Sequence, residues 1–383
     1  MLKMYFWFFF KTQIQFKTDT MAWIKKENVA MFKGANWNTF IKKVPKCTPE
    51  EAKRIAVKDP EISFFFFCRE FMVLETLGDK GVFNPGDAVF FSGEPWYGSA
   101  PQCDSYEKTG LSVAYVSIDK LQTPGCYTMA DGSAAVDVVC VFAANINKKP
   151  FPPGSVALAP YTKVPEGYPY VVGSAEYASL TAGDIQKLQN KGITVLLTLL
   201  NNHDVTGWSE FPDAATATNF SEQLKEVVDR LGLDGIDIDD EYSAGKPIAS
   251  SLVTVTTIMK QLMPGNIISK ALFDDYQYFK PVYQNQTLAD NLTYGWEMSY
   301  WETPEERLPI YTTFGMTTNT LVCGFWSGHP SQSPSNDVSW LKENNYEGVM
   351  VYAFQDQPNI DLLGELVNDW NGNGNWNKTS NCP

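Results

Sequence analysis

The chain has 383 residues, of which 44% are hydrophobic and 14% aromatic, and it carries a formal net charge of −14. A chain of this length can form one large domain with a sizeable core and a smaller additional part. The negative charge, with no basic run along the sequence, excludes nucleic acid and anionic membrane surfaces as partners.

The first residues do not form a clear targeting signal. The apolar run at 4–10 is too short to span a bilayer, and no small-residue cleavage site follows it. We interpret this opening as a damaged signal or as translated upstream sequence, with Met21 as an alternative start.

Cysteines and glycosylation sequons indicate the compartment. Cysteines cluster in the first third of the chain and recur beside the C-terminus: Cys47, Cys68, Cys103, Cys126 and Cys382. Acceptor sequons for N-glycosylation occur at Asn219, Asn285, Asn291 and Asn377. Together these features predict an extracellular or secretory location. Disulfide pairing, sequon occupancy and oligomeric state stay open.

The first part of the chain has mixed patterns. Residues 1–33 are poorly defined, and residues 34–106 read as an accessory α+β module. Within it, a helix is predicted with Thr48 as N-cap, Pro49 in the first helical position and Glu51 closing a capping box. Strands are predicted at 61–74 and 87–93. Trp96 and Tyr97 lie among turn formers, which allows either a sugar-binding module or a structural extension of the main domain.

From about residue 110, apolar strand candidates alternate with amphipathic helices. The strand candidates are 111–118, 136–144, 193–200, 233–239, 266–273, 292–300, 319–326 and 347–354, and the clearest helices are 181–192 and 216–232. The strands are apolar almost throughout, as expected of strands buried on both faces. The pattern predicts a (β/α)8 TIM barrel over 107–370, with a small N-terminal α+β extension and a polar tail at 371–383.

The stretch LDGIDIDDEY, residues 233–242, places several acids on an otherwise apolar strand. Because side chains alternate along a strand, Asp237, Asp239 and Glu241 point to one side and the isoleucines to the other. In a barrel these acids line the interior, and Glu241 reaches the C-terminal rim, where barrel enzymes perform their chemistry. Carboxylates at this spacing repel one another, so at least one proton should be retained, which can hold Glu241 protonated as a general acid.

Two non-catalytic interpretations of the acidic stretch fit less well. An EF-hand loop starting at Asp237 requires Gly at its sixth position and Glu at its twelfth, where Tyr242 and Ile248 stand. A solvated acidic face leaves the alternating isoleucines unexplained. Asp234 and Asp240 point to the other side of the strand and are expected to cap or hold loops.

The run from Asp234 to Glu241 resembles the DGxDxDxE signature of glycoside hydrolase family 18, and the resemblance extends over about 110–370. It implies that Glu241 is the acid/base, that Asp239 orients the N-acetyl group of the substrate, and that Asp237 partners Asp239. It also implies that the substrate's own acetamido oxygen attacks the anomeric carbon, unlike the usual two-carboxylate scheme.

Within that family, the chain is most similar to Endo H-like endo-β-N-acetylglucosaminidases, which cut the chitobiose core of N-glycans. The segments that carry this similarity are 114–119, 141–147, 196–204 and 233–242. Chitinases of the family typically have an S-x-G-G motif where this chain has residues 199–202, and a Trp on strand eight where it has Tyr352. A Gly is common in the subgroup at the position of Asn201, so the loop shape there stays open.

Further residues are expected to contact the substrate. The segment GWEMSYWE is similar to the family segment whose Tyr hydrogen-bonds the acetamido carbonyl, a role that falls on Tyr300. Tyr115 would close the floor of the site, and Asn201 and Asn202 would bind sugar hydroxyls at the strand-three rim. His203 is interpreted as a loop-packing residue, because the family chemistry needs no His.

Tryptophans near strand ends have two interpretations. They can stack on sugar rings or pack in the core, and the sequence does not separate these roles: Trp208, Trp296, Trp301 and Trp326. We take Trp296 and Tyr352 as candidates for substrate binding.

The sequence thus predicts a retaining hydrolase of β-1,4-linked N-acetylglucosamine, with N-glycan cores as the favoured substrate. A chitinase is the alternative within the enzyme class, and an inactive sugar-binding barrel is the alternative outside it, although such relatives usually lose the acid that Glu241 supplies. No metal or organic cofactor is implied.

Overall fold

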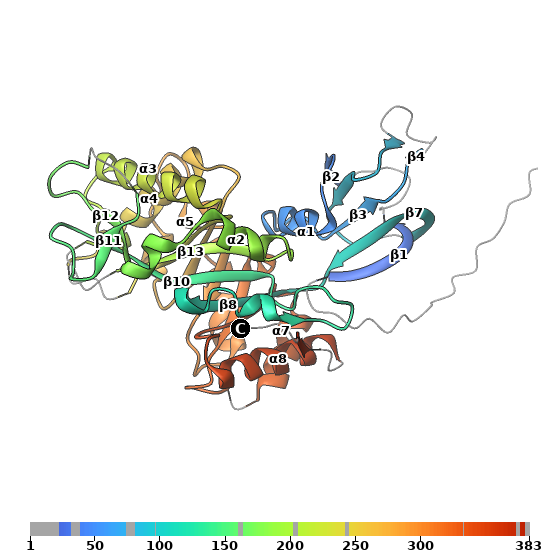
Figure 1. Ribbon diagram of the computed structural model, residues 1–383. Coiled ribbons are helices and arrows are strands. Elements are labelled where there is room, and N and C mark those ends of the chain that lie inside the picture. The colour runs from blue at the N-terminus through green and yellow to red at the C-terminus, as the bar shows by residue number, and fades with distance from the viewer. Residues whose placement is uncertain are drawn as a thin grey trace, which may run out of the picture.

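The computed structural model describes residues 23–31, 39–73, 81–95, 97–159, 164–201, 206–241, 245–331, 333–372 and 376–379. Trp96, Asn202 and His203, on which predictions were made, lie outside the described residues. A barrel and a smaller N-terminal module lie beside each other in Figure 1.

Within the described residues, eight parallel strands close into a barrel, which confirms the predicted fold. The strands are β8 (Leu111–Ser117), β10 (Val138–Asn147), β13 (Thr194–Asn201), β14 (Gly235–Asp239), β15 (Ile267–Leu272), β16 (Tyr294–Glu297), β17 (Leu321–Phe325) and β18 (Gly348–Val351). They pair in this order, and β8 pairs with both β10 and β18, which closes the ring. Each predicted apolar segment overlaps one of these strands, and β10 and β13 extend beyond the predicted ends.

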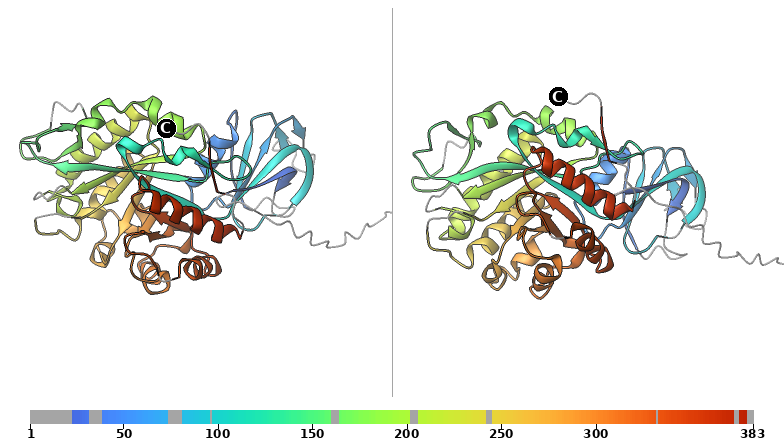
Figure 2. Two further views of the ribbon diagram at one scale, coloured as in Figure 1. Left: turned by 60° about the horizontal axis from the view of Figure 1, so that its bottom comes forward. Right: turned by 90° about the horizontal axis from the view of Figure 1, so that it is seen from below.

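Helices surround the barrel, as the two views of Figure 2 show. They are α2 (Ala182–Gln189), α3 (Ala214–Leu231), α4 (Ser251–Leu262), α5 (Leu288–Asn291), α6 (Pro304–Thr312), α7 (Pro334–Glu343) and α8 (Gln357–Asn371). Two antiparallel strands, β12 (Tyr170–Ser174) and β11 (Ser155–Ala157), extend the sheet from β10. None of the described helices is long and apolar enough to cross a membrane.

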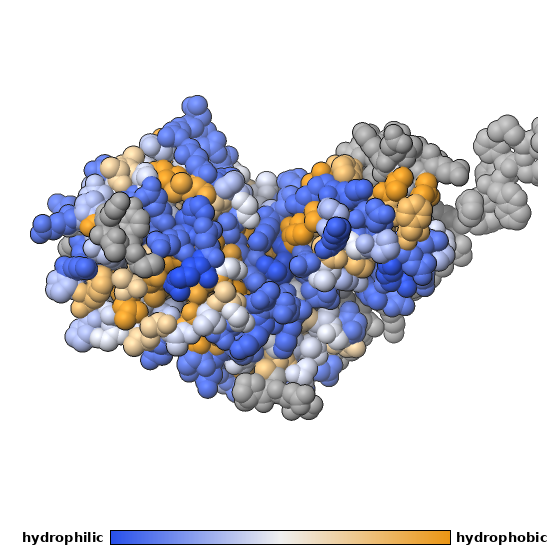
Figure 3. Space-filling model, turned by 45° about the horizontal axis from the view of Figure 1, so that its top comes forward, coloured by the Kyte–Doolittle hydropathy of each residue, from blue (hydrophilic) through white to orange (hydrophobic). Residues whose placement is uncertain are grey.

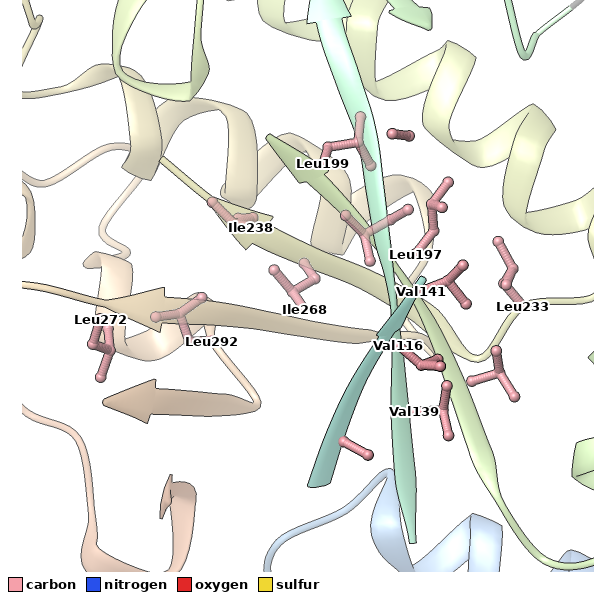
Figure 4. Close-up of a cluster of buried hydrophobic side chains, with 14 of the residues drawn as sticks. Val116, Val139, Val141, Leu197, Leu199, Leu233, Ile238, Ile268, Leu272 and Leu292 are labelled. Atoms are coloured by element: carbon pink, nitrogen blue, oxygen red, sulfur yellow. The ribbon is translucent and has the colours of Figure 1, made fainter. Parts of the chain in front are cut away.

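The outward side chains of the barrel strands pack beneath these helices. Figure 4 shows Val116, Val139, Leu197, Ile238 and Ile268 in this layer, and all of them are buried. The inward side chains belong to a different cluster, which includes Tyr115, Leu196 and Trp296. The strand parity inferred for β14 is therefore correct: Ile236 and Ile238 face the helices, and the acids face the interior.

The N-terminal module is built on an antiparallel sheet whose described strands follow the order β1, β7, β3, β6, β2. Their bounds are β1 (Trp23–Met31), β7 (Tyr97–Lys108), β3 (Phe64–Cys68), β6 (Ala88–Phe91) and β2 (Phe40–Val44). The sheet thus begins inside the segment that the sequence left undefined, because β1 pairs along most of the length of β7. Figure 3 shows a notch between this module and the barrel on the face in view.

Helix α1 (Pro49–Val57) of the module has the predicted start. Thr48 accepts a hydrogen bond from the Glu51 backbone N–H, the Glu51 side chain accepts one from the Thr48 N–H, and Pro49 begins the helix. One face of α1 is buried, and Ala52, Ala56 and Val57 share a cluster with residues inside the barrel.

Polar contacts hold α1 against the N-terminal end of the barrel. Asp234, at the start of β14, is 1% exposed and forms ion pairs with Arg54 at 2.5 Å and Lys58 at 2.8 Å. Burial alone raises the pKa of Asp234, but these two cations outweigh it and hold that pKa below its usual value. The Tyr294 hydroxyl also donates to the Val57 carbonyl at 2.7 Å. The module is therefore joined to the barrel through shared apolar and polar contacts.

Candidate active site

The candidate site lies at the C-terminal end of β14. Gly235 starts this strand because a Cβ there would lie 2.1 Å from the Ile267 carbonyl oxygen of β15. Because Gly235 has no side chain, the backbones of β14 and β15 can pair at this position. Asp237, Asp239 and Glu241 then point into the barrel interior at alternate positions along the chain. Asp237 and Asp239 are buried, whereas Glu241 is half-buried at the rim.

Asp237 is held by hydrogen bonds from several strands. Its Oδ1 accepts from Ser269 Oγ at 2.6 Å and from Trp296 Nε1 at 2.9 Å. Its Oδ2 accepts from Tyr115 at 2.7 Å and from Thr198 Oγ1 at 2.8 Å. Burial raises the pKa of Asp237, and these donors oppose that shift by favouring the carboxylate. The contacts fix the Asp237 side chain in one orientation and occupy both of its oxygens.

Asp239 lies between two other acids and is 3% exposed. Burial, followed by the negative charges of Glu241 and Asp237, raises the pKa of Asp239 well above its usual value, and a hydrogen bond to Glu241 adds to the shift. The raised pKa favours a proton at Asp239, which is one of the acids that the sequence predicted to retain at least one proton. Among the described residues, no donor reaches Asp239 Oδ1.

The raised pKa of Asp239 predicts a pH-dependent stability. Well below the reference pKa of Asp, about 3.9, this carboxyl is protonated in both the folded and the unfolded chain. At higher pH the unfolded chain releases the proton and the folded chain holds it, so the contribution of Asp239 to wild-type stability falls as the pH rises. Asn has no proton to release. The Asp239→Asn variant should therefore gain stability relative to wild type between about pH 4 and neutrality.

Thermal unfolding of both proteins across this pH range measures the effect. Asp361→Asn, a change of an exposed carboxylate on α8, is the matched control and should give a curve that runs parallel to wild type. If the Asp239→Asn curve also runs parallel to wild type, Asp239 does not hold its proton in the folded protein.

Aromatic side chains form a wall beside the acids. Tyr300 follows β16, Tyr352 follows β18 and Trp326 follows β17, and all three are half-buried. Their ring centroids are 6.3 Å apart for Tyr300 and Tyr352, and 5.9 Å from Trp326 to each of them. Burial raises the pKa of Tyr300 well above its usual value, so this hydroxyl keeps its proton.

Tyr115 and Trp296 lie deeper than the wall. Tyr115 is 3% exposed and Trp296 is 0% exposed, and both direct their polar atoms to Asp237. In this arrangement they support the acidic strand from below.

Asn201 is also buried, and its side-chain amide hydrogen-bonds to other residues of the protein. Its Nδ2 donates to Asp240 Oδ1 at 2.7 Å, and its Oδ1 accepts from the Trp208 backbone N–H at 3.1 Å. Asp240 further accepts from Ser209, in the loop after β13. Asp240 thus holds loops, as its parity predicted, and Asn201 ties the end of β13 to the end of β14.

The structure also separates the tryptophans that the sequence left ambiguous. Trp208 is fully buried, and its ring N–H donates to the Leu199 carbonyl at 2.8 Å, so it is a core residue. Trp301 is 56% exposed at the rim.

Thr198 and Ser269 are site residues that the sequence did not single out. They pair directly with Asp237 in the registers of β13 with β14 and of β14 with β15. Each is a polar residue at an inward position of an otherwise apolar strand, and that signal could have identified them. Among the described residues, no group of three or more His, Cys, Asp or Glu side chains is arranged to hold a metal ion.

Comparison with curated proteins finds endo-beta-N-acetylglucosaminidases. The chain is 34% identical over 203 residues to one from Flavobacterium sp. (strain SK1022), covering 49% of this chain and 58% of that protein. It is 33% identical over 152 residues to endo-beta-N-acetylglucosaminidase F1 of Elizabethkingia meningoseptica, covering 36% of this chain and 40% of that protein. The matched region thus spans about half the length of these relatives. These matches confirm the resemblance seen in the sequence, and no protein-family model matches the chain.

Solved structures of Bacteroides thetaiotamicron EndoBT-3987 have the same fold. Its complex with a Man9GlcNAc2Asn substrate matches with a TM-score of 0.55 and 14% identity, covering 95% of this chain and 92% of that chain. Its complex with a Man5GlcNAc product matches with a TM-score of 0.54. Both matches extend over the N-terminal module as well as the barrel, since they cover 95% of this chain.

Proposed function

We propose that this protein is an endo-acting glycoside hydrolase that cleaves the β-1,4 bond between the two N-acetylglucosamines of N-glycan cores, with retention of configuration. The observation that carries the proposal is the acidic strand. Asp239 has a raised pKa beside Glu241 at the rim, and Asp237 is fixed below them by hydrogen bonds.

Glu241 is assigned the role of acid and base. It is the least buried of the three acids and lies where a glycosidic oxygen can reach it. When the acetamido N–H of the substrate donates to Asp239, it favours the ionised form of Asp239, so the proton shared by the pair passes to Glu241. Glu241 then protonates the glycosidic oxygen as the bond to the anomeric carbon breaks.

The nucleophile is assigned to the substrate. Asp237 has both oxygens occupied by donors, and Asp239 is engaged by the acetamido N–H of the substrate. The acetamido oxygen therefore forms the new bond to the anomeric carbon and gives an oxazolinium. Asp239 stabilises its positive charge, and Tyr300 donates to the acetamido oxygen. Water, deprotonated by Glu241, then opens the ring and restores the original configuration.

Other residues are assigned supporting roles. Tyr115 and Trp296 position Asp237, and Asn201 positions the loop ends around Asp240. Tyr352 provides the aromatic floor beside Tyr300.

The curated relatives favour N-glycan cores over chitin, since both are named endo-beta-N-acetylglucosaminidases. Tyr352 supports this choice, because it offers a smaller stacking face than the Trp expected in chitinases. The presence of Glu241 disfavours a barrel that only binds sugar, because such barrels usually lack this acid.

The substrate assignment predicts a large difference between two substrates. The protein should release the glycan from a high-mannose glycopeptide, leaving one N-acetylglucosamine on the peptide, at a kcat/KM at least about a hundredfold above that for chitotetraose. A site that pairs with mannose hydroxyls loses those hydrogen bonds with a substrate that lacks them. Mass spectrometry of both reactions measures the ratio. Equal or better cleavage of chitotetraose would make the protein a chitinase, and no cleavage of either would favour a binding protein.

We further propose that the protein works outside the cell or in the secretory pathway. Cys126 is disulfide-bonded, which suits an oxidising compartment. Asn285 and Asn377 are exposed and can accept a glycan, whereas Asn291 is 2% exposed and donates to Thr256 and Thr257.

A further inference from the structure

We propose that Phe273 and Trp301 form a platform at the rim of the barrel that binds a mannose ring in an arm of the glycan. This inference rests on the proposed function and assigns a carbohydrate subsite outside the catalytic wall of Tyr300, Tyr352 and Trp326.

The two platform residues are large apolar side chains that lie open to solvent. Phe273 is 42% exposed and Trp301 is 56% exposed. They follow the neighbouring strands β15 and β16, and their ring centroids are 5.8 Å apart with an interplanar angle of 77°. Rings exposed to this degree contribute little to the core, so core packing does not explain why large apolar side chains occupy these two positions. An exposed aromatic face is the usual surface on which the apolar face of a sugar ring stacks.

The platform is held in place by one arginine. Arg307 of α6 bonds to Asp274 at 3.0 Å and to Glu302 at 2.8 Å, and these acids directly follow Phe273 and Trp301 in the chain. Arg307 also donates to Ser299 Oγ at 2.8 Å. Both loops that carry the aromatic rings are thus joined to the same helix. A surface fixed before binding loses less conformational entropy when a ligand is bound.

A continuous series of aromatic contacts connects the platform to the catalytic wall. Trp301 lies 5.9 Å from His329, and His329 lies 5.1 Å from Trp326, measured between ring centroids. Trp326 in turn contacts Tyr300 and Tyr352. A sugar chain that leaves the catalytic wall in this direction therefore meets Trp301 on the same rim.

The groove beside Trp301 has polar groups suited to sugar hydroxyls. It has a volume of about 670 Å³, and its lining includes Glu302, Thr303, Ser331 and Asn336. Carboxylate, amide and hydroxyl oxygens accept hydrogen bonds from sugar hydroxyls, and the amide N–H of Asn336 donates to them. An aromatic wall with such groups around it is the chemistry expected of a carbohydrate site.

The position of the platform selects the arm of the glycan. The Trp301 ring contacts His329, which in turn contacts Trp326 of the catalytic wall, so the platform extends the aromatic surface beyond that wall. On the leaving-group side, the proposed substrate offers one N-acetylglucosamine and then peptide. The mannose arm offers several rings in succession, and we therefore assign the platform to a ring of that arm.

The test compares two glycopeptides that differ only in the arm: one carries the full high-mannose glycan and the other is trimmed to the trimannosyl core. Trp301→Ala should lower kcat/KM for the full glycan about tenfold, mainly through KM, and should change it for the trimmed glycan less than twofold. Trp301→Tyr, which keeps a flat ring, should retain most of the activity. Phe71→Ala is the matched control, because Phe71 is 58% exposed on the N-terminal module, and it should behave as wild type.

Each failure has a separate signature. If wild type cuts both glycopeptides and Trp301→Ala does so equally well, the platform is not a subsite. If Trp301→Ala loses activity equally on both, the assignment to the arm is wrong. Poor activity of a stable Trp301→Tyr protein on the full glycan would show that a flat aromatic ring is not sufficient at this position, and would overturn the proposal. If wild type leaves both glycopeptides intact, the proposed function itself fails.

Discussion

Replacing Glu241 by Gln should lower kcat on a glycopeptide by about three powers of ten, because the amide cannot donate a proton to the leaving oxygen or take one from water. KM should change little, since Gln has nearly the same shape and Glu241 is half-buried at the rim. Single-turnover hydrolysis of an unactivated high-mannose glycopeptide, followed by mass spectrometry, measures the loss.

The control for this variant is Glu343→Gln, which removes an exposed carboxylate from α7. It should retain wild-type kcat, and both variants should unfold at the wild-type temperature. Near-normal hydrolysis by a folded Glu241→Gln protein would show that another group donates the proton.

Removing residues 1–104, so that the chain begins at Ser105, should leave the barrel insoluble or inactive. The cut removes α1 and most of the N-terminal sheet, and it exposes the cluster that α1 shares with the barrel interior. It also removes Arg54 and Lys58, which form ion pairs with Asp234 at the N-terminal end of the barrel.

A chain that begins at Met21 is the matched control, because it keeps every described strand from β1 onward. It should fold and retain full activity. Solubility, circular dichroism and hydrolysis of a small glycopeptide compare the two truncations. A soluble, active protein beginning at Ser105 would make the N-terminal module a separate unit.

The barrel could be predicted because its strands are buried on both faces, which gives each one a continuous apolar run. Local capping signals likewise predicted the start of α1 at Thr48. The docking of α1 could not be predicted in this way. Arg54 and Asp234 are 180 positions apart, and the sequence around either residue does not identify the other as its ion-pair partner.

The candidate site also combines features that the sequence could predict with features that it could not. Parity placed Asp237, Asp239 and Glu241 inside the barrel, since it depends only on alternation along one strand. Depth depends on several strands together, and the sequence did not provide it. Tyr115 and Asn201 therefore looked like sugar ligands, whereas their polar groups are directed to Asp237 and Asp240. The raised pKa of Asp239 likewise depends on its depth, which the sequence did not provide.

The docked position of α1 has a consequence for folding during synthesis. Residues 23–108 leave the ribosome first, and their sheet can pair at once because all of its described strands lie before Leu111. The partners of α1 emerge much later: Asp234 binds Arg54, and Tyr294 binds Val57. The apolar face of α1 therefore stays exposed, and can bind chaperones, until the barrel strands have been made. The last barrel strand, β18, pairs with β8, which leaves the ribosome directly after the module, so the ring of strands cannot close until almost the whole chain has been made.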